Sequence, residues 1–522
     1  MPSEWIDKYR GKFAQGWDVV REQTLARQKR LGVVPLDTEL PPRPDWIPAW
    51  DHLSPDEQRL YARMMEVFAG CLSYADHQIG RLTDTLVKTG DIANTLFFVV
   101  SDNGASAEGG LAGSFDQGRW FNGSPEGLEE NLSRLDQLGG PGSYNHYPAG
   151  WAMAGNTPLR GFKGDVLEGG TKVPLIVCWQ RGIRSRGEVR RQYVHAIDLV
   201  PTVLTALGAA APEVINGVRQ SPLEGVSFAY SFAAPEEPTR REAQYFELLG
   251  RRAIWHKDWK AVADHRPDSG QDFIHDRWEL YHLAGDASEC RDLAASYPDE
   301  LRELIERWWV EASKYNVLPL DDRLIGRLEE RRPKPGRPRT SFTYYPDTSE
   351  VHASAAALTL GGSLTITAEL EIPVGGAEGV LFAQGSRRGG HCLFVKDQRP
   401  VYVHSYIDGE EYTVTADRHL PLPSGRVVVR LRLARTGRGE GLGVLYVNGV
   451  TVGEGMIEHI TPVTFSATRS GIRIGRDSAP GVSCRYDPPF AFTGSVEKVV
   501  VEVRGEQAWD SEAEARTILA RG

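Results

Sequence analysis

The sequence contains no long apolar run. None of its 522 residues falls in a stretch that approaches the roughly 18 consecutive apolar residues needed for a membrane-spanning helix. The opening residues, Met1 to Trp5, contain neither the basic region nor the apolar region of a signal peptide. We therefore expect no membrane contact, and a cytoplasmic location is favoured for the chain as written.

Cysteine is scarce, and its five positions are scattered without a CxxC or zinc-type spacing. An odd number of isolated cysteines predicts thiols that are mostly reduced, buried and structural. A disulfide between Cys392 and Cys484, which share the C-terminal region, is the less favoured alternative.

A basic surface is also missing, because the formal net charge is -10 and no Lys/Arg stripe is sustained. This argues against a nucleic-acid partner. Hydrophobic residues at 41% and charged residues at 25% are usual for globular proteins, and the length predicts two or three domains.

The first part of the chain has the pattern of an α/β fold. A helix is expected from Trp5 to about Leu31, and a second from the N-terminal signal at Ser54 to about Lys88. The continuously apolar run 95–100 predicts a central strand covered on both faces. Polar residues follow this strand at its carboxyl end, where α/β sheets place their ligands.

Further elements follow along the chain. We expect a strand at 173–179, a short helix at 195–207, β segments at 244–248, 259–263 and 278–283, and a helix at 298–313. A basic, proline-rich segment at 331–339 predicts a linker. Beyond it, short alternating strands predict an all-β jelly-roll sandwich.

Asp102 and Asn103 offer two hard oxygen donors at the end of the predicted strand, as Ca²⁺ or Mg²⁺ requires. The alternative for this pair is a turn that only caps backbone N–H groups. Lys163 is a compact cation suited to an anionic group, and Arg160 is its rival.

Several segments in this order resemble the type I, formylglycine-dependent sulfatases of the alkaline phosphatase superfamily. They are 74–82, 97–104, 156–163 with 168–170, 195–202 and 278–283. The resemblance extends over about residues 1 to 325 and corresponds to the C-terminal portion of such an enzyme. It implies that Asp102 and Asn103 help to hold Ca²⁺, with Mg²⁺ as the alternative, and that Lys163 contacts the sulfate ester. His146, in a loop resembling one beside the pocket of some arylsulfatases, is a further substrate-contact candidate.

The resemblance gives the expected architecture in detail. An incomplete alkaline-phosphatase-like α/β/α core is expected at 1–235, and a small antiparallel sheet with a helix at 236–325. A linker at 326–341 and a concanavalin/laminin-G-like sandwich at 342–522 complete the chain.

The nucleophile motif of this family is missing from the sequence. No cysteine or serine is followed by Pro at the second position and Arg at the fourth, the pattern whose first residue becomes formylglycine. We therefore expect a sulfuric ester hydrolase by family, acting on a small sulfate monoester, but no hydrolysis by the chain as written.

Two other functions remain open. One is a phosphonate or phosphate ester hydrolase of the same superfamily, and the other is a non-catalytic, glycan-binding or scaffold protein. The sandwich is expected to serve structure or homo-oligomerisation, with carbohydrate as the alternative partner.

Overall fold

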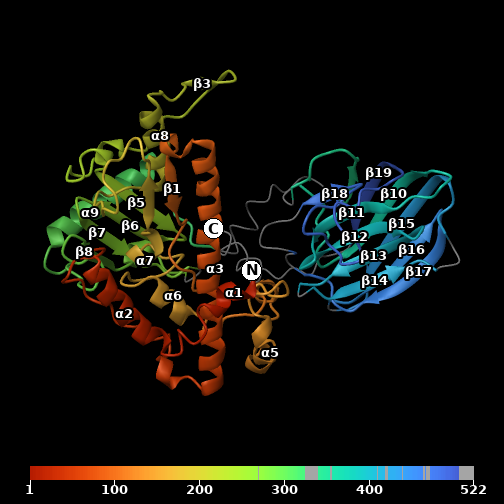
Figure 1. Ribbon diagram of the computed structural model, residues 1–522, viewed down its shortest axis with the longest axis horizontal. Coiled ribbons are helices and arrows are strands. Elements are labelled where there is room, and N and C mark those ends of the chain that lie inside the picture. Colours follow the sequence, from red (N-terminus) through yellow and green to blue (C-terminus); the bar gives the residue numbers. More distant parts are fainter. Residues whose placement is uncertain are drawn as a thin grey trace. The chain divides into compact units, whose positions relative to one another are not determined.

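The computed structural model describes residues 1–267, 270–323, 339–352, 355–407, 409–417, 421–437, 439–462, 465 and 471–504. The chain divides into two compact units (Figure 1). The first comprises Met1–Gly113 and Tyr147–Leu324, and the second comprises Ser114–His146 and Ile325–Gly522. The predicted linker segment 331–339 lies, except for its last residue, outside the described residues.

The first unit opens with three helices, α1 (Ser3–Asp7), α2 (Gly16–Arg30) and α3 (Pro55–Thr89). The start of α3 is the predicted one, because the Ser54 side chain accepts from the Glu57 N–H while Glu57 reaches back to the Ser54 N–H. The single helix expected from residue 5 to 31 is wrong, since a turn separates α1 from α2. Gly16 ends that turn with φ of 81°, and a Cβ there would lie 2.1 Å from the Trp50 ring.

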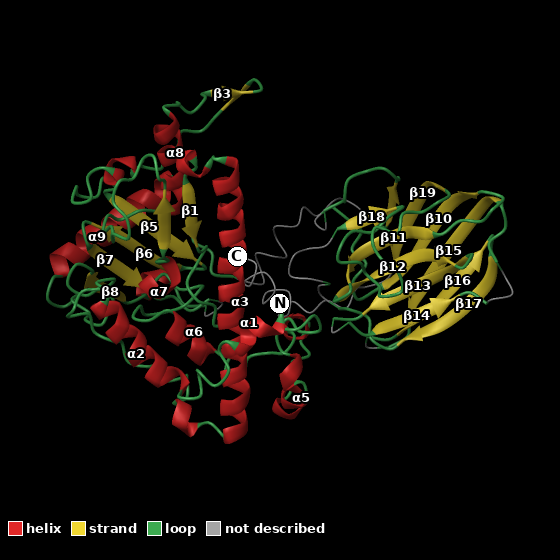
Figure 2. Ribbon diagram, in the orientation of Figure 1, coloured by secondary structure: helices red, strands yellow, loops and turns green. Residues whose placement is uncertain are grey.

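The core of this unit has two centres. Trp17, Trp50 and Trp151 pack ring against ring, with centroids 4.8 to 5.8 Å apart. Trp151 lies on α6 (Ala149–Gly155). The second centre is a four-stranded antiparallel sheet of β5 (Ala243–Leu248), β6 (Arg251–His256), β7 (Trp259–Ala263) and β8 (Trp278–His282) (Figure 2). One face of this sheet packs on α9 (Pro298–Lys314).

The strand β1 (Phe97–Val100) pairs antiparallel with β2 (Leu175–Cys178), and these two form a two-stranded sheet. Neither strand contains a buried residue, so the apolar faces that a complete α/β core would cover are exposed in this chain. In fact no residue from 71 to 108 is buried, which includes the second half of α3. The residues of this region have the apolar pattern of buried elements, but their side chains are partly or fully exposed.

The remaining elements of the first unit are short: α7 (Glu168–Thr171), α8 (Leu199–Leu207), β3 (Val214–Ile215) and β4 (Val218–Arg219), with 3₁₀ turns at Trp50–His52, Ile92–Asn94, Ala196–Asp198, Ala229–Phe232 and Phe273–His275. The second unit contributes α4 (Gln117–Phe121), α5 (Leu128–Ser133) and a 3₁₀ turn at Leu135–Gln137 from its N-terminal segment.

The C-terminal region is built from two antiparallel sheets, which confirms the predicted β-sandwich. The six-stranded sheet has the order β17-β16-β15-β10-β19-β9, and the five-stranded sheet has the order β14-β13-β12-β11-β18. The alternating inward side chains of both sheets form a continuous core. The strands are β9 (Ser341–Tyr344), β10 (Ser363–Ile372), β11 (Gly379–Ser386), β12 (Gly389–Lys396), β13 (Arg399–Ser405), β14 (Glu411–Thr415), β15 (Gly425–Arg435), β16 (Gly441–Val447), β17 (Val450–Ile457), β18 (Ile472–Ile474) and β19 (Ser495–Arg504).

The cysteines differ from expectation in their burial. All five are free, so the Cys392–Cys484 disulfide is absent, but only Cys392 is buried. Cys71 and Cys178 lie on the uncovered part of α3 and on β2, which explains their exposure. In the part of the chain that the structure describes, no helix combines the length and apolarity needed to cross a bilayer.

Candidate functional site

The polar residues that follow β1 form the first part of the candidate site. Asp102 is exposed and Asn103 is partly exposed. The Ser101 hydroxyl donates to the Asn103 carbonyl oxygen at 3.1 Å. A hydrogen bond from the Asn103 side chain is the main reason that the pKa of Asp102 lies below its usual value. Asp102 is therefore ionised at neutral pH and accessible to a cation.

Lys163 comes from a distant part of the sequence to the same loop. Its backbone N–H donates to the Ala105 carbonyl at 3.0 Å, two residues after Asn103. Its Nζ lies 3.4 Å from Glu108 Oε1, and the side chain is largely buried. The structure therefore brings the segment of Lys163 together with the segment of Asp102 and Asn103, as a shared site requires.

Asn156 joins these segments, and the sequence analysis gave it no role. Its Oδ1 accepts from the Ala105 N–H at 2.8 Å, while its Nδ2 donates to the carbonyls of Gly161 and Gly169 at 2.9 and 2.8 Å. One amide side chain thus fixes three loop segments. The sequence feature that could have pointed to Asn156 is its place directly before Thr157-Pro158, a pattern typical of a turn.

Arg160, the rival cation, is engaged elsewhere. Its Nη1 donates to the Tyr281 hydroxyl at 2.6 Å and lies 3.4 Å from Glu279 Oε2. Both partners belong to β8. The guanidinium of Arg160 is thus held by residues of β8, whereas the ammonium of Lys163 lies beside Glu108, in the segment that follows Asn103.

His146 lies in the second unit, in a local antiparallel bridge with Ser114. The two residues exchange backbone hydrogen bonds of 2.9 and 3.0 Å. The bridge accounts for the backbone position of His146 and gives no role to its imidazole. Its contact with substrate stays a prediction.

The residues present fit part of a divalent-cation site. Asp102 and Asn103 supply the hard oxygens that Ca²⁺ prefers, but Ca²⁺ takes about six to eight oxygen ligands. Among the described residues, no group of three or more His, Cys, Asp or Glu side chains is placed to hold a metal ion. The two residues would therefore provide a minority of the ligands.

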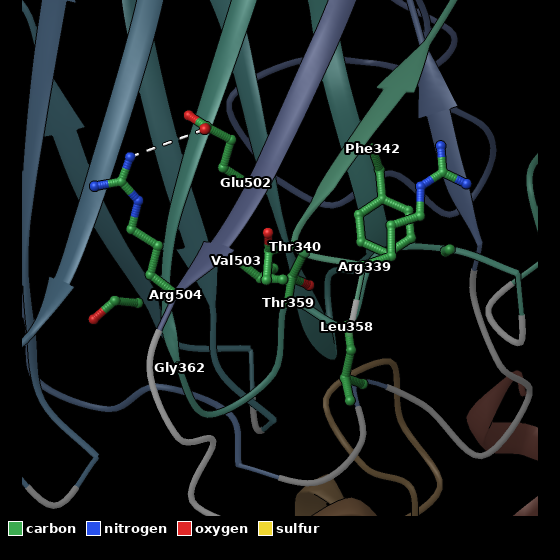
Figure 3. Close-up of a pocket in the computed structure, with 11 residues that line it drawn as sticks. Arg339, Thr340, Phe342, Leu358, Thr359, Gly362, Glu502, Val503 and Arg504 are labelled. Atoms are coloured by element: carbon green, nitrogen blue, oxygen red, sulfur yellow. Dashed lines mark ion pairs between the residues drawn. The ribbon is translucent and has the colours of Figure 1, made fainter. Parts of the chain in front are cut away.

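A cavity of about 560 Å³ lies in the sandwich and is lined only by residues of the second unit (Figure 3). Its lining includes Arg339, Phe342, Leu358 and the pair Glu502–Arg504, whose charged atoms lie 3.9 Å apart. The cavity borders the points where the described residues end, and we assign it no function.

The first unit therefore presents an α/β region with two polar loops held together at the end of a strand. The Sulfatase family model matches residues 1–209, which include both loops. An uncharacterized sulfatase of Schizosaccharomyces pombe is 32% identical over 329 residues, 62% of this chain and 57% of that protein. An arylsulfatase of Klebsiella aerogenes is 30% identical over 244 residues, 47% of this chain and 50% of that protein.

Residues 1–209 thus match the sulfatase family model, which confirms the resemblance over that part of the chain. The chain spans about half the length of these curated relatives.

Proposed function

We propose that this chain is part of a sulfuric ester hydrolase of the arylsulfatase type, acting on a small sulfate monoester. The observation that supports it best is the pairing of the Asp102-Asn103 and Lys163 loops within the region that matches the sulfatase family. Paired oxygen donors and a nearby cation suit the binding of a metal ion together with an anionic ester.

In this proposal, Asp102 and Asn103 hold Ca²⁺, for which Mg²⁺ is the alternative, and Lys163 contacts the sulfate group. When bound, the cation would neutralise charge on the ester oxygens. Glu108, 3.4 Å from the Lys163 ammonium, orients it before substrate arrives. His146 is a further candidate for contact with the substrate.

We further propose that the 522 residues alone do not turn over sulfate esters. No Cys or Ser in them has Pro and Arg at the second and fourth following positions. In this proposal Asp102, Asn103 and Lys163 supply the groups that bind the cation and the sulfate. The formylglycine nucleophile of the family would have to come from residues that are not among these 522.

Hydrogen exchange in the presence of Ca²⁺ tests the metal assignment. We expect Ca²⁺ to protect amides at 101–106 with a Kd near or above about 1 mM, because two protein ligands make a weak site. Asp102→Asn should abolish the protection, whereas Asp84→Asn, an exposed aspartate on α3, should leave it intact. Equal protection in wild type and Asp102→Asn would reject the assignment.

A turnover assay with an aryl sulfate tests the proposal that the 522 residues alone do not hydrolyse sulfate esters. We expect no product above background from the purified 522-residue chain, with or without added Ca²⁺. Turnover that is lost in Lys163→Ala would show that the chain is catalytically sufficient, and the nucleophile would then have to be sought among the present residues.

A further inference from the structure

A fully buried lysine lies beneath the candidate site. Lys260 on β7 has no exposed surface, and its Nζ lies 2.8 Å from Glu168 Oε1 and 3.1 Å from Glu289 Oε1. Glu289 Oε2 also accepts from the Glu168 backbone N–H at 2.7 Å. Burial raises the pKa of Glu289 to about 7. Burial also opposes ionisation of Glu168, but pairing with Lys260 and Lys172 outweighs it and lowers the pKa of Glu168.

Glu168 is the first residue of α7, and the two glycines after it touch the site loops directly. The Gly170 carbonyl accepts from the Gly104 N–H at 3.2 Å. The Gly169 carbonyl accepts from Asn156, and the Gly169 N–H donates to the Arg160 carbonyl at 2.6 Å. Gly104 lies so close to α7 that a Cβ on Gly104 would be 1.7 Å from the Gly169 carbonyl oxygen. A shift of Glu168 therefore reaches Asn103 through its neighbour Gly104.

The same face of the small sheet holds the Lys163 loop. Tyr281 is the cross-strand partner of Lys260 in the register of β7 and β8. Its hydroxyl accepts from Arg160 at 2.6 Å, three residues before Lys163. Two neighbouring side chains of this sheet thus hold α7, which contacts the loop of Asn103 through Gly104, and the loop of Lys163.

We propose that Lys260 is a positioning residue for the cation and sulfate site and acts through Glu168 and α7. The assignment of the site itself rests on the proposed function. Stability alone explains this cluster poorly, because well-packed apolar residues of similar size are often at least as stable as buried ion pairs. What the charges add is a defined position for Glu168, since its carboxylate must meet the Lys260 ammonium.

Arg252 provides a matched control on the same sheet. It is equally buried and pairs with the buried Asp276. Its guanidinium lies near Trp278 and Trp308, on the side of the sheet that packs on α9. Lys260→Met and Arg252→Met therefore both remove a buried cation from one sheet, but only the first touches α7.

Hydrogen exchange of the full chain, with and without Ca²⁺, tests the proposal. Under conditions where the variant remains folded, Lys260→Met should raise amide exchange at 103–106 and 160–170. It should also weaken Ca²⁺ binding about tenfold or more, which is the usual effect of losing a residue that supports a metal ligand. Arg252→Met should raise exchange in β6 and α9 and leave both loops and the Ca²⁺ Kd unchanged. Increased exchange in Lys260→Met that stays within β7 and 284–292 would overturn the proposal.

Two features keep the outcomes distinct. If Lys260→Met does not fold, the double variant Lys260→Met with Glu289→Gln is used instead. It removes one charge of each sign and leaves Glu168 paired with Lys172, 3.4 Å away. Raised exchange in the same two loops is expected for this variant. If Ca²⁺ protects nothing in the wild type, the proposed function fails. The effect of Lys260→Met on loop exchange without Ca²⁺ still decides the positioning role.

Discussion

Gly104 packs against the backbone of Gly169 and Gly170 without room for a side chain. Its φ is in the ordinary range, so alanine is excluded only by space, with the Gly169 carbonyl oxygen 1.7 Å from the position of a Cβ. We expect Gly104→Ala to lower the free energy of unfolding by about 1–3 kcal/mol, as overpacking does, because one backbone segment must move. Urea unfolding followed by tryptophan fluorescence measures this change.

Gly80→Ala is the control for this prediction. Gly80 lies within α3 and a Cβ there meets nothing within 4 Å. This variant should be neutral or up to about 1 kcal/mol more stable, because alanine is the better helix former. A loss of stability in Gly80→Ala equal to that in Gly104→Ala would contradict the steric argument.

Residue identity showed which groups could meet a ligand, but not what supports them. Asp102, Asn103 and Lys163 stood out because their chemistry is specific and their segments resemble a family. Asn156 and Lys260 were not recognised, because their roles depend on contacts with residues up to 92 positions away. A buried lysine in a β segment has no local pattern that separates it from a solvated one.

Among the elements, the facing strands β12 and β13 contain two buried histidines, His391 and His404, with ring centroids 6.3 Å apart. Burial lowers the pKa of His404 to about 4 and that of His391 well below its usual value. Both are neutral when folded, whereas the unfolded side chains titrate near about 6.5. The sandwich should therefore lose stability as the pH falls from about 6.5 toward 4, by up to about 1.4 kcal/mol per pH unit for each histidine.

Hydrogen exchange of β12 and β13 in the full chain, at pH 7 and pH 5, measures this loss. In His404→Gln the pH dependence should fall by about half, since glutamine retains an acceptor for the Thr461 N–H that His404 Nε2 now binds at 3.2 Å. His275→Gln, an exposed histidine of the first unit, should change nothing. Identical pH profiles for wild type and His404→Gln would count against the buried-imidazole explanation.

Local signals located most elements and failed where distant contacts decide. Ser54 and Glu57 at the start of α3 and Gly90 at its end act within a few residues, and both ends were predicted. The break between α1 and α2 depends on Trp50, 34 residues beyond Gly16. The strand β6 was not predicted, because Arg251–His256 shows little alternation of apolar and polar residues.

At the scale of the whole molecule, the first unit exposes an unusual amount of apolar side chain. The uncovered half of α3 presents Leu72, Ile79 and Leu82, and β1 and β2 add Val100 and Ile176, each more than 40% exposed. Because β1 and β2 pair with each other among the described strands, each also has an edge without a partner strand there. Such surfaces bind apolar molecules and favour association.

We therefore expect the purified chain to enhance the fluorescence of an apolar dye such as ANS and to associate as its concentration rises. The double variant Leu72→Gln with Leu82→Gln should reduce both effects while changing the free energy of unfolding by no more than about 0.5 kcal/mol per site, because neither side chain is in a packed core. Leu36→Gln removes a leucine that is 79% exposed in a loop and should alter neither signal. Dye fluorescence measures the first effect and sedimentation velocity measures the second. A wild-type chain that stays monomeric and does not enhance ANS fluorescence would mean that this surface is covered in solution.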